Sequence, residues 1–294
     1  MLFIPSEIKD SVSNMISINY LTIDFEEWYQ GLTSTSIRIQ DWDSFEKRIE
    51  VGSTWLLKTL AKAGAKATFF IVGSVAEDRP DIVRKISKEK HEIGAHGCYH
   101  QRISTMNLQE FRKDLKKNII LIQKACGQQP VGFRAPCFSF NDQTGWVWEV
   151  MAEFGIRFDS SIFPIINPLY GTPIAKREPH EILSTNGTIW EFPMSTIRLA
   201  GVNFPFSGGF YFRVLPYFLI RNITQHFNSK DKPVIFYFHP WEFDPDHPKP
   251  KSVTWRERLS HYGGLRGTRK KFERLLRDFS FCPLGSAIEI SHEG

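Results

Sequence analysis

The amino-acid sequence predicts an α/β fold in which parallel strands alternate with helices. Short apolar runs rich in β-forming residues recur along the 294 residues, and amphipathic segments with helical periodicity separate them. Polar residues suited to chemistry close five of these runs, which is where parallel β/α folds gather their functional groups. The length allows one large domain or two ordinary ones, and the alternation leaves a barrel and an open doubly wound sheet as alternatives.

The elements are expected in a regular order along the chain. We predict strands at 18–25, 66–73, 91–97, 131–136, 156–161 and 233–239, and helices at 42–64, 79–90, 107–127, 142–155 and near 216–228, followed at 269–281 by a last helix that leads into a seventh strand. The first helix is expected to begin at an Asp/Ser cap and to end at Gly64, and the third begins with the capping box of Asn107 and Glu110. A Pro/Gly-rich stretch at 164–211 is expected to be loosely structured.

Composition and charge exclude several classes of protein. The net charge of +5 is mildly basic, but no dense Lys/Arg run with interleaved aromatic residues indicates a nucleic-acid groove. The four cysteines are scattered without a C-x-x-C pair, so neither a disulfide framework nor a cysteine zinc site is predicted. The first 20 residues lack the pattern of a secretory signal, and no apolar run approaches a membrane span. We therefore expect a cytoplasmic protein with reduced thiols.

The first strand ends in the acidic segment "TIDFEEW". Side chains of a strand alternate between its faces, so Asp24 and Glu26 are expected on one face and Glu27 on the other. An unpaired buried carboxylate is unfavourable, so this pair needs a cation, a metal or solvent. The third predicted strand ends in "HEIGAHGCYH", where His96 and His100 are spaced to face one metal ion. A hydrogen-bonded core histidine beside a surface histidine is the alternative.

Three further strand ends carry candidate groups. Arg134 in "FRAP" is expected to hold a carboxylate by a bidentate ion pair, or else to pair with an acid of a neighbouring helix. His239 ends the apolar run "FYFH" and is suited to general acid catalysis, with a core role as the alternative. Asp159 in "FDSS" is expected either to orient His239 or to cap a turn.

Taken together, the ordered segments "TID", "HGCYH", "RAPCF", "FDSS" and "FYFH" resemble the NodB-homology polysaccharide deacetylases, carbohydrate esterase family four. The resemblance covers roughly residues 18–242. The segments "WEFPMS", "GGFYFR", "HPWEFDP" and "HYGGLRGTRKKFERLL" are similar to a branch associated with bacterial exopolysaccharide and exosortase-type gene clusters, which has its own C-terminal extension. The resemblance implies a distorted (β/α) barrel with about seven parallel strands, in one catalytic domain over 1–294, with the extension at 243–294 packed on the barrel.

The resemblance also implies a reaction and the residues that perform it. The expected activity is the metal-dependent removal of an N-acetyl group from a sugar of a bacterial polysaccharide or its precursor, usually with Zn²⁺. Asp24 matches the catalytic base, Arg134 the residue that tethers it, and His239 the general acid. His96 and His100 match the metal ligands, and Asp159 matches the partner that orients His239. The implied partner is an N-acetylated saccharide, with its identity, its lipid linkage and the oligomeric state left open.

Two departures from the family pattern affect this site. The adjacent Asp-Asp of the family is Asp24–Phe25–Glu26 here, so either Glu26 reaches the metal, which we favour, or two histidines and water hold it. The tyrosine of R-x-P-Y is Cys137, whose backbone N–H is still expected to face the oxyanion, while Phe138 replaces part of the surface of the tyrosine ring.

These motifs say less about which residues contact the substrate and which substrate is bound. Branch-specific residues are candidates for a sugar groove, with core packing or a solvated charge as the alternative; they are Arg213, Trp241, Glu242, Tyr262 and Arg266. Two other functions are consistent with the same motifs. The site can act on another amide, as a deformylase or cyclic imidase, or the chain is a degenerate barrel that binds saccharide without activity.

Overall fold

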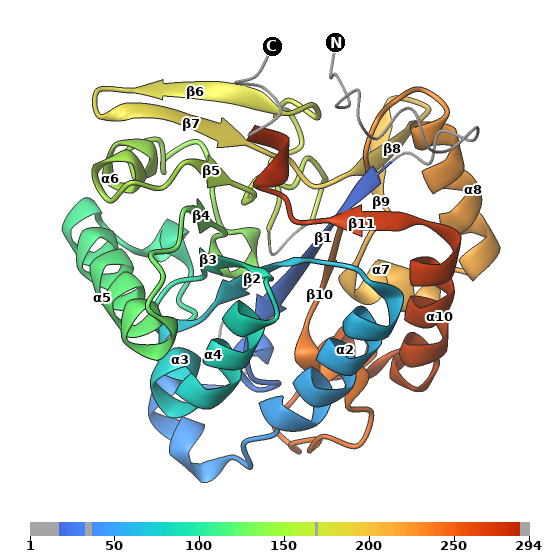
Figure 1. Cartoon of the computed structure of the whole chain (residues 1–294), viewed down its shortest axis with the longest axis horizontal. Helices are drawn as coiled ribbons and strands as arrows, with labels where there is room; N and C mark the ends of the chain where they lie inside the picture. Colours follow the sequence, from blue (N-terminus) through green and yellow to red (C-terminus); the bar gives the residue numbers. More distant parts are fainter. Residues whose placement is uncertain (1–17, 33–36, 168–169, 289–294) are drawn as a thin grey trace.

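The seven predicted strands are all present in the computed structural model, which describes residues 18–32, 37–167 and 170–288. They are β1 (Ile18–Phe25), β2 (Thr68–Ile71), β3 (Glu92–Ala95), β4 (Gly132–Phe133), β5 (Phe158–Asp159), β10 (Ile235–Phe238) and β11 (Ser280–Cys282), and they pair in parallel (Figure 1). The sheet has the order β10-β1-β2-β3-β4-β5, continued by β7 (Gly187–Glu191) and then β6 (His180–Ser184), with β11 beside the beginning of β1. The α/β prediction is confirmed.

Helices cover the outer side of this curved sheet (Figure 1). The helices at or near predicted positions are α2 (Ile49–Ala63), α4 (Pro80–Lys88), α5 (Leu108–Cys126), α6 (Val147–Glu153), α8 (Tyr217–Asn228) and α10 (Leu265–Asp278). Phenylalanine side chains from the strands, among them Phe25, Phe69 and Phe133, are fully buried in the main apolar core. The sheet path ends at β10 and at β6, and these two strands do not pair within the described ranges, so the barrel is distorted and open.

The helix boundaries confirm two of the predicted caps and correct a third. Asn107 caps α5 with Glu110 in a reciprocal capping box, and Gly64 ends α2 in the left-handed conformation with φ 64°. The first helix begins later than predicted, at Ile49, after a short 3-10 helix at Ile39–Ser44. Its first N–H groups are satisfied by a distant carboxylate, because Glu27 accepts hydrogen bonds from the backbone of Arg48 and Ile49.

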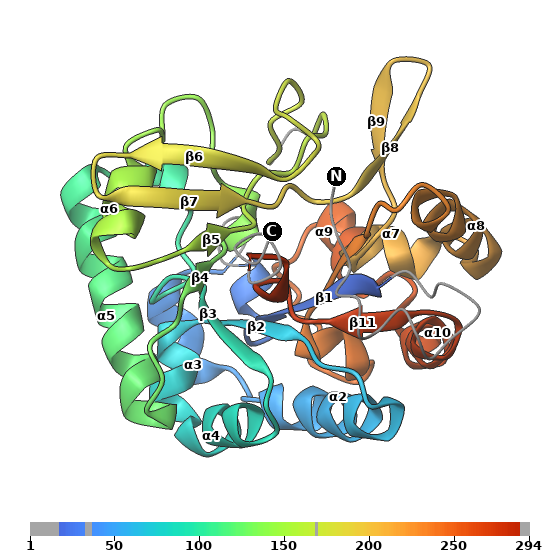
Figure 2. The same ribbon diagram turned by 45° about the horizontal axis from the view of Figure 1, so that its top comes forward.

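The stretch predicted to be loose, 164–211, contains two antiparallel hairpins (Figure 2). The first is β6 (His180–Ser184) with β7 (Gly187–Glu191), and it extends the main sheet through the parallel pairing of β7 with β5. The second is β8 (Thr196–Leu199) with β9 (Val202–Pro205), which forms a sheet of its own. Three short helices were also not predicted: α3 (Gly73–Asp78), α7 (Gly209–Val214) and α9 (Trp255–Tyr262).

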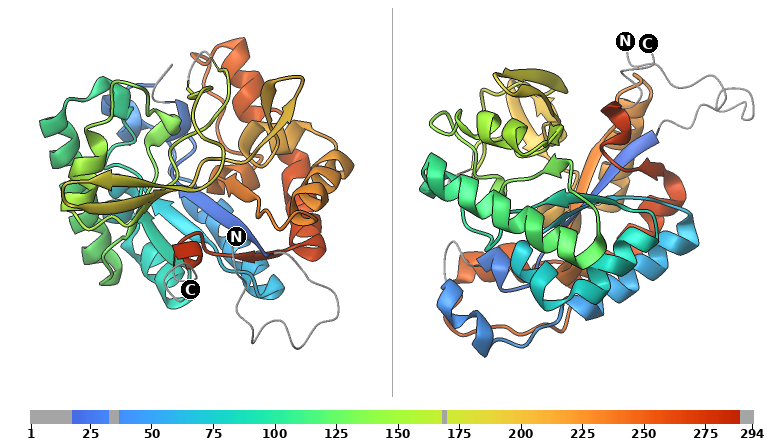
Figure 3. Two further views of the ribbon diagram at one scale, coloured as in Figure 1. Left: turned by 90° about the horizontal axis from the view of Figure 1, so that it is seen from above. Right: turned by 60° about the vertical axis from the view of Figure 1, so that its left-hand side comes forward.

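The C-terminal segment takes part in the barrel itself. Its helix α10 packs against α2 and α8, and β11 continues the sheet by pairing with Ile18–Tyr20 of β1 (Figure 3). The described part of the predicted extension, 243–288, therefore includes a strand of the main sheet and is not merely packed on it. No described helix is long and apolar enough to cross a membrane.

The segment that follows β10 is held tightly against α2. It forms the 3-10 helix η5 (Pro240–Phe243), and a Cβ atom at Gly52 of α2 would lie 1.9 Å from the carbonyl oxygen of Pro240. Only glycine allows this approach. The contact sets the position of the loop that carries the side chains of His239 and Trp241.

Candidate active site

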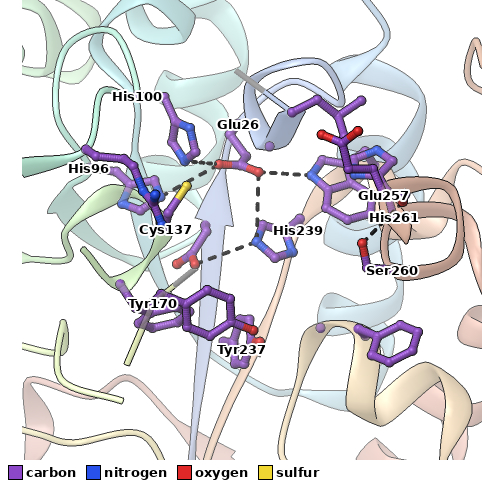
Figure 4. Close-up of a pocket in the computed structure, with 18 of the residues that line it drawn as sticks. Glu26, His96, His100, Cys137, Tyr170, Tyr237, His239, Glu257, Ser260 and His261 are labelled. Carbon is purple, nitrogen blue, oxygen red and sulfur yellow. Dashed lines mark hydrogen bonds and ion pairs between the residues drawn. The ribbon is translucent and has the colours of Figure 1, made fainter. Parts of the chain in front are cut away.

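A cavity of about 190 Å³ opens where the carboxyl ends of the parallel strands meet (Figure 4). The predicted residues that line it are Asp24, Glu26, His96, His100, Cys137, Phe138, Arg213, His239 and Trp241. Arg134, Asp159, Glu242, Tyr262 and Arg266 do not line it. Three of the predicted strand ends contribute directly to the cavity. The end of β1 supplies the carboxylates, the end of β3 leads to the two histidines, and the end of β10 leads to His239. The five strand-end segments quoted from the sequence thus meet at one edge of the barrel, as the parallel arrangement requires.

One group of side chains in this cavity has the composition of a metal site. Glu26, His96 and His100 are all buried, and one ligand atom from each lies within 4.8 Å of the other two. The Glu26 carboxylate lies 2.6 Å from His100 Nε2 and 3.8 Å from His96 Nε2. Two imidazoles and one carboxylate form a ligand set typical of catalytic zinc.

The surroundings favour the neutral form of His96 and the ionised form of Glu26, which are the forms that bind a metal. Burial lowers the pKa of His96 to about 4, and its Nδ1 donates to the carbonyl of Arg134 at 2.7 Å, so Nε2 is the nitrogen turned toward Glu26. Burial works to raise the pKa of Glu26, but the nearby histidines outweigh it and leave that pKa well below its usual range. His100 Nδ1 is buried without a hydrogen-bond partner among the described residues. The donor set therefore fits a divalent transition metal.

Asp24 lies next to this group and is tied to a buried arginine. Arg134, fully buried, donates from Nη1 to Asp24 Oδ1 at 2.7 Å and to the hydroxyl of Thr22 at 2.8 Å. Its other nitrogens donate to the carbonyl and the hydroxyl of Ser160, each at 2.9 Å. The guanidinium thus has partners on three sides, and the other carboxylate oxygen of Asp24 faces His239 Nε2 at 3.8 Å (Figure 4).

His239 has a different carboxylate partner from the one predicted. Its Nδ1 lies 2.8 Å from Glu242 Oε1, which also accepts the His239 backbone N–H at 3.0 Å. Burial works to lower the pKa of His239, but Glu26, Glu242 and Asp24 outweigh it and raise that pKa above its usual value. Glu242 is fully buried, with its second oxygen 3.3 Å from Arg213 Nη1.

The prediction that Asp159 orients His239 is wrong. Asp159 is fully buried at the end of β5 and accepts hydrogen bonds from the backbone N–H and the hydroxyl of Ser161, at 2.8 and 2.7 Å. Its neighbour in the register of β5 and β7 is Glu191, and burial raises the pKa values of both carboxyl groups. The alternative reading of Asp159, as the cap of a turn, agrees with these contacts.

Trp241 forms the centre of a stack of rings in the cavity wall. It lies between His239, with ring centroids 4.8 Å apart, and His261, at 4.0 Å. Its indole N–H donates to Glu26 Oε1 at 3.1 Å, so one residue contacts both the proposed acid and the candidate metal ligand. His261 Nε2 is buried without a hydrogen-bond partner in the described chain. The sequence motif "HYGGLR" contains His261, but the branch candidates taken from it were Tyr262 and Arg266, neither of which lines the cavity.

The remaining predicted residues divide between the cavity and the core. Cys137 has left-handed backbone angles and lines the cavity, while Phe138 is almost completely buried against Phe163 and Tyr237. Glu27 points away from the site, as expected, but it is buried as the cap of α2 and does not face outward. Tyr170 and Glu257 also line the cavity and carried no motif in the sequence.

Comparison with known families agrees with this geometry. Residues 44–158 match the family model described as polysaccharide deacetylase. Over these residues the chain is similar to polysaccharide deacetylases. Residues 160–289 match a domain of unknown function, DUF3473, and this second match contains His239, Trp241 and His261. Asp24 and Glu26 precede both matches, so the acidic end of β1 is placed in the site by the structure and not by these models.

The chain is similar to several curated proteins. It is 32% identical over 113 residues to a peptidoglycan deacetylase of Helicobacter pylori, in a match that covers 38% of each chain. It is 35% identical over 81 residues to a peptidoglycan-N-acetylglucosamine deacetylase of Bacillus cereus (28% of this chain, 30% of that one), and 31% identical over 144 residues to a chitin deacetylase of Arthroderma benhamiae (46% and 38%). The matches span about a third of the length of these relatives.

Solved structures support the fold. A Mycobacterium smegmatis protein described as a polysaccharide deacetylase aligns over 96% of this chain and 93% of its own, with a TM-score of 0.61 and 18% identity. The peptidoglycan deacetylase PdaC of Bacillus subtilis aligns over 96% and 95%, with a TM-score of 0.50 and 13% identity. The predicted distorted barrel is confirmed by these neighbours.

Proposed function

We propose that this domain hydrolyses the N-acetyl group of an N-acetylated sugar in a bacterial polysaccharide or its precursor. The observation that carries the proposal is the arrangement of three groups around one cavity. A Glu26–His96–His100 ligand set lies beside the carboxylate of Asp24, and His239 approaches both from the end of the neighbouring strand β10. Amide hydrolysis needs these parts: a base for water, stabilisation of the oxyanion and an acid for the leaving amine.

Asp24 is the proposed general base. The ion pair with Arg134 orients its carboxylate and leaves Oδ2 on the side of His239. Glu26, His96 and His100 are proposed to hold a divalent ion, with zinc as the first candidate; when bound, such an ion lowers the pKa of water and polarises the amide carbonyl. Asp24 then accepts the proton of the attacking water.

His239 is the proposed general acid. Because its pKa is raised and Glu242 holds Nδ1, the proton available to the substrate lies on Nε2, which faces the cavity. Transfer of that proton to the departing nitrogen releases the sugar amine and acetate. The backbone N–H of Cys137 stays the predicted second donor to the oxyanion, and Arg213 and Trp241 stay predicted contacts of the sugar.

The test is acetate release from N-acetylhexosamine oligomers by the zinc-loaded protein. We expect release by the wild-type chain and its loss in Asp24→Asn and His96→Ala, with His180→Ala, a partly exposed histidine on β6, as the matched control. Release that persists in Asp24→Asn would overturn the assignment of the base.

A parallel panel of formylated amines and cyclic imides separates the other amide substrates. Failure to bind zinc would instead favour the saccharide-binding alternative. The cytoplasmic location, the identity of the sugar and its lipid linkage stay predictions.

A further inference from the structure

The β8–β9 hairpin projects from the body of the molecule (Figure 2) and exposes an apolar face. In its register Ile197 lies opposite Phe204, and Leu199 lies opposite Val202, so these four side chains share one face. Three of them are exposed, Leu199 to 54%, Val202 to 41% and Phe204 to 46%. Ile197 packs against the main core, so the other three side chains form the exposed part of the face. An exposed apolar patch of this kind is typical of a contact surface.

A basic hollow adjoins the hairpin and is lined by Ile197 of its apolar face and by Arg198 of its other face. It is lined by Arg177, Glu178, Ile197, Arg198, His226, Phe227, Lys230 and Lys232, so it combines four cationic side chains with one acid. Glu178 pairs with Lys232 at 2.8 Å, which leaves an excess of positive charge. Arg198 and Lys230 have no ion-pair partner among the residues that the structure describes. Arg177 is held in place, because its guanidinium donates to the hydroxyl and the carbonyl of Thr196 in β8.

The apolar hairpin and the basic hollow lie side by side, and together they indicate which kind of partner binds there. Apolar side chains that enter the headgroup region, next to cations that meet phosphate, are the pattern of interfacial membrane binding. We propose that the β8–β9 hairpin and the basic hollow dock this protein on an anionic phospholipid surface. A nucleic acid would not cover the apolar face, and a purely apolar partner would leave the cations unpaired. No hairpin residue lines the catalytic cavity, so this docking is independent of the proposed function.

The experiment is co-sedimentation of the full chain with vesicles of phosphatidylcholine alone and of phosphatidylcholine mixed with phosphatidylglycerol. We expect binding to the anionic vesicles, little binding to the neutral ones, and weakening as NaCl is raised. Arg198→Glu with Lys230→Glu should lower the affinity for anionic vesicles by about tenfold or more, since each cation near the surface contributes to binding. Leu199→Glu with Val202→Glu should have a similar effect through the loss of the apolar contact.

The matched control is Leu183→Glu, because Leu183 is 79% exposed on the other hairpin, in β6. It should bind vesicles as the wild type does, and circular dichroism should show that all variants keep the fold. Wild-type chain that stays in the supernatant, or a Leu183→Glu variant that loses binding equally, would overturn the proposal. If inorganic phosphate competes with vesicles and the Leu199/Val202 variant still binds, the hollow recognises free phosphate and not a lipid surface. A hairpin variant that changes the sedimentation coefficient without vesicles would assign the face to a second copy of the chain.

Discussion

Glu242 holds both the backbone and the imidazole of His239 with a single oxygen, at 3.0 and 2.8 Å. The two residues are three positions apart, and the short helix η5 turns the carboxylate back over the end of β10. The carboxylate is in turn 3.3 Å from the buried guanidinium of Arg213. Because a carboxylate can only accept, the contact keeps one proton of the imidazole on Nδ1, so the second proton of the protonated ring lies on Nε2, which faces the cavity.

This relationship predicts the effect of Glu242→Gln. The variant keeps the size of the side chain but removes the charge that supports the protonated imidazole, so kcat should fall roughly 100-fold with little change in KM. Steady-state kinetics of acetate release measures both quantities. Glu257→Gln, at another glutamate that lines the cavity, is the control and should keep its kcat. Equal loss in the two variants would contradict a specific role for Glu242.

Trp241→Phe should weaken zinc binding. Phenylalanine can still stack between His239 and His261, but it lacks the N–H that donates to Glu26 at 3.1 Å. Loss of such an outer contact to a ligand typically lowers metal affinity about 10- to 100-fold, and isothermal titration with Zn²⁺ measures this without any substrate. An unchanged dissociation constant would show that Glu26 needs no support from the indole.

Arg134→Met should destabilise the fold by about 3 kcal/mol or more, since it leaves the buried carboxylate of Asp24 without its ion pair. Urea unfolding followed by circular dichroism gives the free energy of unfolding. The double variant Asp24→Asn with Arg134→Met should recover part of that loss, because the uncompensated charge is gone. If the destabilisation of the double variant equals the sum for the two single variants, the loss in Arg134→Met comes mainly from its lost contacts to Thr22 and Ser160.

Stability should fall as the pH rises because of the buried pair of Asp159 and Glu191. Burial raises the pKa of each carboxyl group in the folded state above its unfolded value, so the folded chain binds more protons. Their stabilising contribution is complete below the unfolded pKa and is lost as the pH rises through the folded pKa. Glu191→Gln should reduce this slope and be more stable than the wild type at mildly alkaline pH.

The measurement is the free energy of unfolding by urea across the pH range. Glu181→Gln, an exposed glutamate on β6, is the control and should follow the wild-type curve. A Glu191→Gln curve parallel to that of the wild type would show that the pair does not titrate on unfolding.

Much of the site was predictable because it depends on local pattern. Apolar runs of β-forming residues predict strands, and the parallel arrangement requires their carboxyl ends to meet, so Asp24, Glu26, His96, His100 and His239 were assigned to one cavity before their distances were known. Capping residues predicted the ends of helices wherever the cap is local, as at Asn107 and Gly64.

Only the tertiary structure decided two kinds of contact. The first joins residues far apart in the sequence, and the second involves a side chain that has more than one candidate partner. Glu27 caps a helix 22 residues away, and Trp241 reaches Glu26 across 215 positions, separations at which no periodicity in the sequence relates the residues. The partner of His239 was misassigned because two carboxylates were available, and only the turn of η5 brings Glu242, rather than Asp159, within hydrogen-bond distance. The sequence by itself thus determined which strand ends carry the chemistry, whereas packing determined which side chain supports which, because those pairings depend on distances that only the folded chain defines.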